Sequence, residues 1–486
     1  MARPAGLALR SIHAALWGAS GSALQIALQF GIQVVLARLL GPEPYGLFAM
    51  AAAIISLGGF FTYGIATGLV QKRTLSDDDV RFANCWQLVV GATVALAVFA
   101  LAGPAAAFFQ EPRVAPLIQA LAVLCVVQAL SAVSGALLNR DLDVKSVQLA
   151  ALGAYAIGYG LVGVPLALEG YGVEALVVAC IVQTVAVAAI QYARKRHALG
   201  LAVRHLEAGW FVRYAAAVSA TQINNWTLMQ LPRFVVGRLL PSTAVGLYVL
   251  PFNLVTQLAG TVSSVQTPLF SAGARVQGDS ARLRSVFLTM LAVTALLGAP
   301  PFIGMAAAAH TLVLALYGRA WLESAPLLCA FALAMPLFIA TAMGTPMLWN
   351  SGRTTQELIF QLPIVFVLAA GAWAAAQHSL AAVAWVMLGV FALRFAVITA
   401  AACRALQLGL RDVARACQAG VLVSAAVAAA IMFVDPLADQ PLLALALDIA
   451  AGLAVQLGAL ALLRPWFPAE VRVLFAKLRT LVPGLA

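Results

Sequence analysis

The chain has 486 residues, of which 63% are hydrophobic and 10% are charged, and its mean hydropathy is +0.96. A water-soluble domain of this size cannot cover so much apolar surface with so few charges, so the composition excludes a soluble protein. The sequence predicts an all-α integral membrane protein, because apolar runs of about 20 residues favour helices, whereas barrel strands are shorter and alternate.

The apolar runs follow one another along the chain, and no large loop or soluble domain separates them. We place fourteen predicted transmembrane helices near residues 13–36, 46–70, 82–103, 115–138, 148–168, 171–192, 212–236, 244–272, 285–309, 323–348, 356–376, 378–402, 414–434 and 440–463. The stretch MARPAGLALR is basic, but no small-residue cleavage site precedes the first helix, so we expect that helix to be retained.

The Lys and Arg residues of the short loops predict the orientation. If the amino terminus is cytoplasmic, the basic residues that fall outside are only Arg38, Arg113, Arg238 and Arg319. Arg233 and Arg394 fall within predicted helices, and the others of the 29 Lys and Arg residues lie on the cytoplasmic side. We therefore predict that both termini are cytoplasmic. The net charge of +11 reflects this topology, and no basic run with interleaved aromatic residues indicates a nucleic-acid partner.

One phrase of the sequence occurs twice. VLARLLGPEPYGLF at 35–48 is echoed by VVGRLLPSTAVGLY at 235–248, so that Arg38 and Gly46 recur as Arg238 and Gly246 at an offset of 200 residues. A weaker echo pairs APLIQA with APLLCA at a slightly larger offset. The first predicted helix thus corresponds to the seventh, and the second corresponds to the eighth.

The repeat predicts the domain organisation. We expect a six-helix lobe in residues 1–200, a second six-helix lobe in 201–405, and two additional helices with a basic cytoplasmic tail in 406–486. Because six is even, both lobes enter the membrane from the same side, which is a parallel repeat about an axis along the membrane normal. Two matching lobes around a central cavity are typical of transporters. The other interpretation is an old duplication that is kept only for packing.

Polar side chains form a stripe on the first predicted helix and on its repeat counterpart. One face of the first helix, an arc of roughly 80°, carries Ser22, Gln25, Gln29 and Gln33. The seventh helix carries Gln222, Asn224, Asn225 and Arg233. Such groups are costly in a bilayer and usually face a partner or a water-filled cavity. Amides suit sugar hydroxyls and a guanidinium suits a pyrophosphate, although interhelical hydrogen bonds use the same groups.

Four further charged residues are candidates for function. Arg394 either meets an anionic headgroup or reaches the cytoplasmic surface. Asp448 is the only acid well inside a predicted span, and it is either a proton or cation coupling site or the partner of a basic residue. Arg38 and Arg238 lie at matching outer ends of their helices. They either cap helix carbonyls, pair with Glu43 or headgroups, or close an outer gate.

Other patterns indicate structure and argue against chemistry. The six Cys and five His residues have no metal-ligand spacing, so we expect no metal and no cofactor. In TLSDDDVR, the spacing of Ser76 and Asp79 predicts a helix cap. A membrane-embedded glycan polymerase or ligase needs a large outer loop with catalytic groups. The predicted outer loops are short, so we expect a transporter and not an enzyme.

Residues 34–80, VVLARLLGPEPYGLFAMAAAIISLGGFFTYGIATGLVQKRTLSDDDV, resemble the amino-terminal signature of polysaccharide-export flippases. This family is the Wzx-like, polysaccharide-transporter branch of the multidrug/oligosaccharidyl-lipid/polysaccharide superfamily. The segments ALLNRDL at 136–142 and NSGR at 350–353 are similar to colanic-acid-type exporters within it.

The resemblance implies a flippase of the bacterial inner membrane. Its substrate would be an undecaprenyl-diphosphate-linked oligosaccharide, a repeat unit of an exopolysaccharide, capsule or O-antigen, moved from the cytoplasmic to the periplasmic leaflet. The resemblance further implies alternating access driven by a proton or sodium gradient, a cationic cavity to which Arg233 and Arg394 would contribute, and partners among membrane lipids and other polysaccharide-assembly proteins. A multidrug/cation antiporter of the same superfamily is the alternative, with Asp448 in its site.

Overall fold

The computed structural model describes residues 21, 24–72, 74–197, 200, 202, 205, 208–274, 280–350 and 354–462. Within these ranges, side chains are not described at 60–64, 217–225, 261–274, 280–281, 345–346, 348–350 and 354–358. The described residues are almost entirely helical, and they contain no β-strand. The all-α prediction is therefore confirmed.

The chain forms two compact units, residues Met1–Val249 and Leu250–Ala486. These units come from packing, whereas the predicted boundaries at 200 and 405 come from the sequence repeat. The lobe boundaries stay a prediction.

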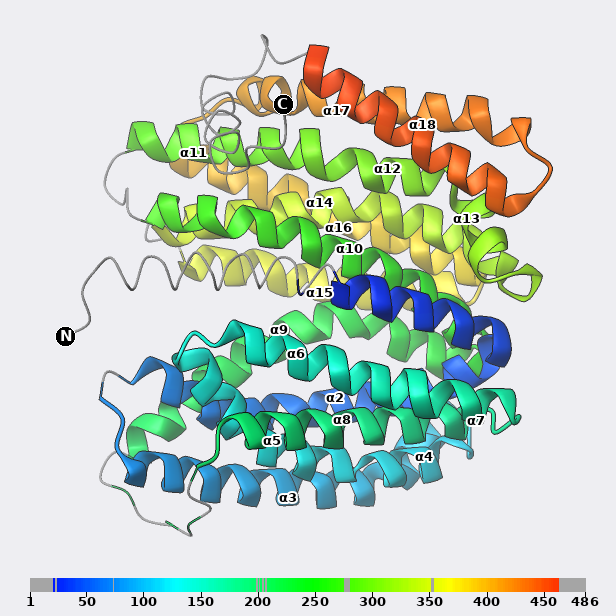
Figure 1. Cartoon of the computed structure of the whole chain (residues 1–486). Coiled ribbons are helices and arrows are strands. Elements are labelled where there is room, and N and C mark those ends of the chain that lie inside the picture. Colours follow the sequence, from blue (N-terminus) through cyan, green and yellow to red (C-terminus); the bar gives the residue numbers. More distant parts are fainter. Residues whose placement is uncertain are drawn as a thin grey trace. The chain divides into compact units, whose positions relative to one another are not determined.

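The first unit contains a layer of long helices (Figure 1). Its helices are Leu24–Leu40, α2 (Pro42–Gln71), α3 (Asp77–Phe109), α4 (Val114–Leu121), α5 (Val123–Arg140), α6 (Val144–Tyr155), the π-helical segment η1 (Ala156–Gly163), α7 (Val164–Leu168), α8 (Val173–Arg194) and α9 (Ala208–Leu239). Helices α2, α3 and α5 pack on one another, and α9 packs against α2. The core between α2, α3, α5 and α9 includes Leu69, Phe82, Val133 and Phe211.

Helix α10 (Ser242–Ala274) begins in the first unit and continues into the second. The second unit then contains α11 (Ser280–Val293), the π-helical segment η2 (Thr294–Gly298), α12 (Ala299–Ala307), α13 (Ala309–Leu316), the 3-10 helix η3 (Arg319–Ser324), α14 (Ala325–Asn350), α15 (Thr354–Ala376), α16 (Leu380–Leu406), α17 (Leu410–Val434), the 3-10 helix η4 (Asp435–Leu437) and α18 (Pro441–Leu462). Helix α14 packs on α16, and α17 packs on α12 and α18.

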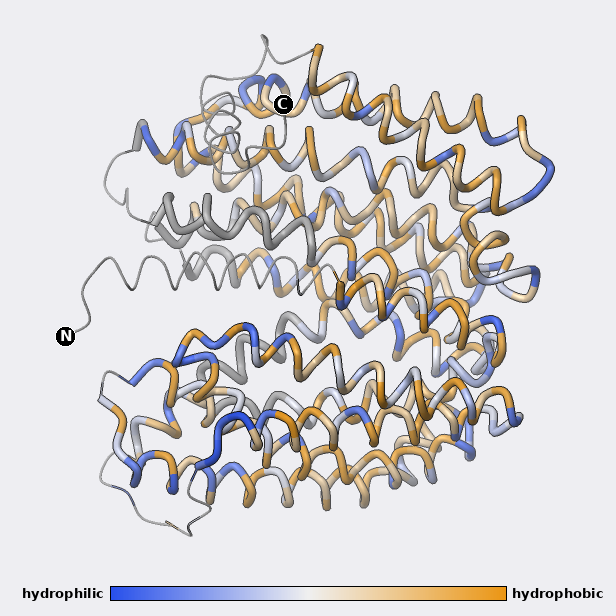
Figure 2. The backbone as a smooth tube through the Cα atoms, viewed as in Figure 1, coloured by the Kyte–Doolittle hydropathy of each residue, from blue (hydrophilic) through white to orange (hydrophobic). Residues whose placement is uncertain are grey.

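Where its residues are described, each predicted span falls on one helix or on consecutive helical segments of the chain; residues 13–20, 22 and 23 of the first predicted span lie outside the described residues. Among the described residues, 11 helices are long and apolar enough to cross a membrane, or up to 12 if the bent pair Leu24–Leu40 and Pro42–Gly59 is one span. Apolar residues run along the helices and hydrophilic residues concentrate at their ends (Figure 2). The chain is a multi-pass membrane protein, and the count of fourteen spans stays a prediction.

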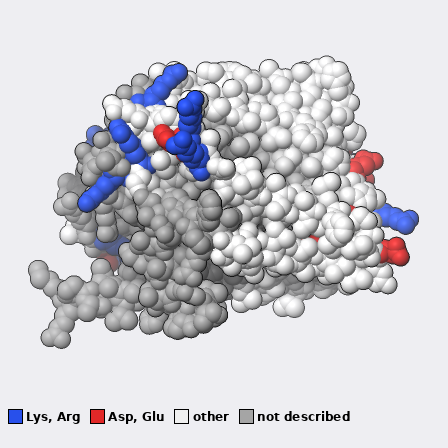
Figure 3. Space-filling model, turned by 90° about the horizontal axis from the view of Figure 1, so that it is seen from above, with Lys and Arg blue, Asp and Glu red and all other residues white. Residues whose placement is uncertain are grey.

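Charge also separates along the helices. On the face shown in Figure 3, most Lys and Arg side chains gather at one end, and a broad uncharged band separates them from a mostly acidic group at the other end. In α17, for example, Arg411 and Arg415 lie in the first two turns, and Asp435 follows the last turn. An uncharged band between charged ends is expected of helices that cross a bilayer.

In each unit, one helix is interrupted by a π-helical segment just before a proline. The π-helical segment η1 ends at Gly163, two residues before Pro165, and η2 ends at Gly298, two residues before Pro300. Proline cannot donate its backbone hydrogen bond, and a π-helical turn is one way in which the preceding carbonyls find other donors. Each segment is therefore a natural point of bending.

Candidate functional site

The two copies of the repeated phrase meet each other in the first unit. A Cβ atom placed on Gly46 would lie 1.7 Å from the backbone oxygen of Ser242, and one placed on Gly246 would lie 1.8 Å from the backbone oxygen of Pro42. Ser242 and Gly246 are the repeat counterparts of Pro42 and Gly46, so the contact is reciprocal, as in a two-fold interface. We call this crossing of the first turns of α2 and α10 the repeat corner. No residue larger than glycine fits at either central position.

The chain turns sharply into the repeat corner at Gly41. This glycine has φ of 75°, and the helix Leu24–Leu40 is bent by 119° against α2 there. An L-residue with a side chain is strained at such a φ, so glycine is required at this position.

An ion-pair group flanks the corner. The Arg113 guanidinium contacts Glu43 on α2 at 2.8 Å and Glu111 at 2.9 Å. The hydrogen bonds from Arg113 lower the pKa of the Glu111 carboxyl, and the two carboxylates raise the pKa of Arg113. Glu43 therefore pairs with Arg113, which joins the start of α2 to the α3–α4 turn.

The second arginine of the repeat caps a neighbouring helix. Arg238 donates a hydrogen bond to the Phe108 backbone oxygen at 3.0 Å, and its guanidinium lies 5.8 Å from the centre of the Phe108 ring. Phe108 is in the last turn of α3, where backbone carbonyls lack helical donors. The predicted carbonyl-capping contact is thus present for Arg238, whereas Arg38 lies exposed at the end of its helix.

The polar stripe of the first helix lies among aromatic residues. Gln25, Gln29 and Gln33 are all partly buried on Leu24–Leu40. Tyr45 donates to the backbone oxygen of Gln33 at 3.3 Å, and Tyr155 of α6 lies 3.5 Å from that of Gln29. The predicted amides are therefore neither fully exposed nor sealed in the core.

The counterpart stripe on α9 is only partly described. Three of its predicted members have side chains outside the described residues, namely Gln222, Asn224 and Asn225. Just beyond them, the Trp226 indole donates to the Ser56 hydroxyl of α2 at 2.9 Å. This hydrogen bond ties the polar half of α9 to α2.

Arg233 is a buried cation near the end of α9. It is 8% exposed, and its Nε atom has no hydrogen-bond acceptor among the described residues. The fully buried Tyr248, in the portion of α10 that belongs to the first unit, lies close enough for electrostatic interaction. A buried guanidinium without a carboxylate partner is costly and suits an anionic ligand.

Arg394 lies within the second unit on α16. Its Nη2 atom donates to Gln361 of α15 at 3.4 Å, and its guanidinium lies 5.9 Å from the centre of the Phe338 ring of α14. Its neighbours come from the packed helices α14, α15 and α16, and the choice between an anionic headgroup and the cytoplasmic surface stays a prediction.

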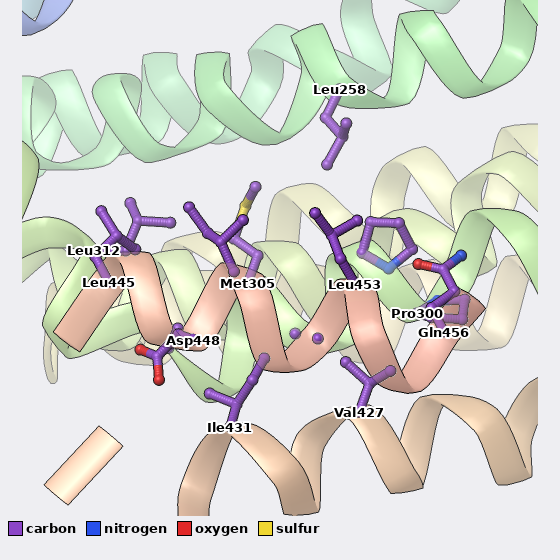
Figure 4. Close-up of a pocket in the computed structure, with 15 residues that line it drawn as sticks. Leu258, Pro300, Met305, Leu312, Val427, Ile431, Leu445, Asp448, Leu453 and Gln456 are labelled. Carbon is purple, nitrogen blue, oxygen red and sulfur yellow. The ribbon is translucent and has the colours of Figure 1, made fainter. Parts of the chain in front are cut away.

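Asp448 is a buried acid of the same unit. It lies on α18, is 1% exposed, and lines a cavity of about 270 Å³. At the far end of that cavity lies Gln456, on the same helix (Figure 4). No basic residue in the described part of the chain pairs with Asp448, so the predicted alternative of an ion pair is not seen there.

Sequence reasoning missed a polar network at the other end of the first unit. Asp79 is 1% exposed and contacts the Lys72 amine at 2.5 Å and the His205 Nε2 atom at 3.1 Å. Its other oxygen accepts from the Ser76 backbone N–H at 2.8 Å, which completes the predicted capping box. Arg140 donates to the backbone oxygen of Lys72. Besides the predicted cap, the recurrence of Asp79 as Asp279 in the repeat was a signal in the sequence.

The structure thus groups the candidates by unit. The glutamines, Arg233 and the repeat corner belong to the first unit, whereas Arg394 and Asp448 belong to the second. Among the described residues, no group of His, Cys, Asp or Glu side chains has a metal-binding arrangement.

The chain is similar to known proteins that are named for polysaccharide biosynthesis or transport. The chain is 25% identical to the lipopolysaccharide biosynthesis protein WzxC of Escherichia coli over 66% of this chain and 65% of that protein. It is 24% identical to the succinoglycan biosynthesis transport protein ExoT of Rhizobium meliloti over 69% of this chain and 68% of that protein. The matched segment therefore spans slightly less than two thirds of WzxC.

Solved structures share the fold. The lipid II flippase MurJ, in its inward closed conformation, superposes with a TM-score of 0.68 at 12% identity over 94% of this chain and 99% of that chain. The family of polysaccharide biosynthesis proteins matches residues 35–326, which begin with the repeated phrase and cover more than half of the chain. The chain therefore belongs to this polysaccharide biosynthesis protein family.

Proposed function

We propose that the chain is a flippase that moves a lipid-linked oligosaccharide across the membrane. The observation that carries this proposal is Arg233, a buried guanidinium with no carboxylate partner among the described residues, in a multi-pass member of a polysaccharide biosynthesis family. A flippase for a diphosphate-linked glycan needs such a cation, because the diphosphate loses its hydration when it enters the protein. The named relatives and the MurJ-like fold support the same class of substrate.

In this proposal the substrate divides between protein and lipid. The diphosphate binds Arg233, with Arg394 as a second candidate cation, and the first sugars meet the amides of Gln25, Gln29 and Gln33. The polyprenyl chain stays in the bilayer. The protein would act in a bacterial inner membrane, with both termini cytoplasmic, and would transport its substrate without catalysing a reaction.

The repeat corner supplies a gate in the same proposal. Its arginines, Arg38 and Arg238, lie on the predicted outer side, and the Gly46–Gly246 crossing closes the two repeat-related helices against each other there. Alternating access requires this crossing to separate when the protein opens outward. A proton or sodium gradient would drive the change between inward-open and outward-open states, with Asp448 as the coupling residue.

Arg233 offers the direct test of this assignment. Arg233→Ala should abolish glycan export while the protein level in the membrane stays normal. Arg233→Lys should retain part of the export, because it keeps the charge but loses the planar fork. The matched control is Arg213→Ala, since Arg213 is an exposed arginine on the same helix. Normal export by Arg233→Ala would sink the assignment.

A second candidate is a multidrug/cation antiporter, which the buried acid Asp448 favours. An antiporter of this kind should bind organic cations in competition with its coupling ion. Export of cationic dyes from cells, lost in Asp448→Asn and unaffected in Arg233→Ala, would favour it over the flippase.

A further inference from the structure

The buried carboxyl of Asp448 has an unusual environment. It lies in the second turn of α18, and neither of its oxygens has a hydrogen-bond donor among the described residues. It opens into the cavity whose other walls include Pro300, Ile431 and Gly452. In Figure 4 the carboxyl lies at one end of this cavity, beside Ile431. A carboxylate in such an apolar site would be strongly destabilised.

The polar neighbour of Asp448 is a second carboxyl group, that of Asp435. Asp435 follows the last residue of α17 and begins η4, which packs against α18, and its carboxyl interacts electrostatically with that of Asp448. The Thr311 hydroxyl of α13 donates to Asp435 Oδ1 at 2.5 Å. This bond fixes one oxygen of Asp435.

Among the described residues, the helices packed against α18 bring no cation to Asp448. Helix α18 packs against α12, α13, α17 and η4. Helix α12 has no titratable residue, and the His310 side chain of α13 is exposed. The ionisable groups of α17 lie in its first two turns, at the end opposite Asp435, and Asp439 in the following loop is exposed. Asp435 is the only charged group that acts on Asp448 within the described part of the chain.

Two adjacent carboxyl groups without a cation cannot both be ionised at low cost. Each carboxylate accepts hydrogen bonds and donates none, so contact between the two requires a proton on one of them. Such a pair binds its protons as a unit. The geometry therefore points to a site that holds one proton at rest and can take a second.

The cavity joins this pair to a bend in the chain. Asp448 lies seven residues after Pro441, or about 10 Å into the helix, near the α17–α18 loop, which the predicted orientation places outside. From there the cavity reaches Pro300, just after the π-helical segment η2. At its far end, the Gln456 amide donates to the Leu297 backbone oxygen of η2 at 3.4 Å. The cavity therefore has Asp448 at one end and a segment that can bend at the other.

We propose that Asp435 and Asp448 form a proton-binding carboxyl pair, open to the outer aqueous phase in one state, whose second protonation favours a change of bend at η2 and Pro300. The step is the addition of H⁺ to a pair of one carboxylate and one carboxylic acid, which gives two carboxylic acids and removes one negative charge. No oxidant or other reactant is needed. The role of this step in driving transport rests on the proposed flippase function, whereas the proton site itself does not.

Infrared spectroscopy of the full-length protein in lipid nanodiscs tests the site directly. At neutral pH the wild type should show a protonated-carboxyl C=O band that shifts in D₂O. Asp448→Asn should lose the band, Asp435→Asn should shift its frequency because the polar neighbour of Asp448 changes, and the matched control Asp439→Asn, an exposed acid of the same loop, should leave it unchanged. A band that persists in Asp448→Asn, or none in the wild type, would overturn the proposal. Loss of the wild-type band on adding Na⁺ would also overturn it, in favour of a metal-cation site.

A transport measurement tests separately whether proton binding by the carboxyl pair drives transport. In proteoliposomes, stimulation of glycan transfer by an inward proton gradient should be lost in Asp448→Asn and retained in Asp439→Asn. If the band behaves as expected but Asp448→Asn retains the stimulation, the coupling part is wrong. If the wild type transfers no glycan while the band behaves as expected, the proton site stands and the flippase function fails.

Discussion

At the residue scale, the repeated glycines explain why one phrase occurs twice. Gly46 and Gly246 each face the backbone oxygen of the other copy's first helical residue, and neither position has room for a Cβ atom. The sequence predicted that these positions are equivalent. It did not predict that they touch, because an offset of 200 residues is equally compatible with lobes whose equivalent corners lie apart.

The first prediction concerns this contact. Gly246→Ala should destabilise the protein by about 1–3 kcal/mol, the usual cost of overpacking, because the added methyl group would overlap the Pro42 carbonyl. The readout is the unfolding temperature in detergent. Gly103→Ala is the control, since a Cβ atom at Gly103 meets nothing within 4 Å. Equal unfolding temperatures for wild type and Gly246→Ala would contradict the close crossing.

At the element scale, the helices were largely predictable and their connections were not. Each predicted span has a helix because a run of apolar residues in a bilayer can satisfy its backbone in no other local way. The π-helical segments η1 and η2 were not predicted, although Pro165 and Pro300 marked their places. The capping box at Ser76 and Asp79 was predictable, because all its groups lie within four residues.

The other contacts of Asp79 could not be predicted from the sequence, because their residues are farther apart along the chain. Lys72 precedes α3, whereas His205 comes from the segment before α9, far along the chain. Only the packing of α9 against the start of α3 brings them to one carboxylate. Phe82 and Phe211 then cover the site, with the His205 ring 5.2 Å from that of Phe82.

The second prediction tests this network as a tie between elements. Asp79→Asn removes the charge that Lys72 and His205 share and should destabilise the first unit by about 3–5 kcal/mol, the cost of breaking a buried pair. Asp78→Asn is the control, because that carboxylate is 78% exposed. Hydrogen exchange should increase in α9 of Asp79→Asn alone. Unchanged exchange there would show that the network does not hold the segment.

At the scale of the whole molecule, the class of protein was predictable and the site was only outlined. Composition and repeat indicated a membrane transporter, and the signature in residues 34–80 falls largely inside the matched family segment. The sequence also marked Arg233 and Asp448 as charges within spans. It could not tell that Asp448 lies beside Asp435, because the α17–α18 turn alone decides which face of α18 meets that carboxyl.

Transfer of the substrate itself tests the central claim most directly. The purified protein would be reconstituted in liposomes with a labelled undecaprenyl-diphosphate oligosaccharide from the host's own glycan, and its movement between leaflets would be followed with and without a proton or sodium gradient. We predict gradient-dependent transfer by the wild type and none by Arg233→Ala. Absence of transfer by the wild type, or equal transfer by Arg233→Ala, would contradict the account.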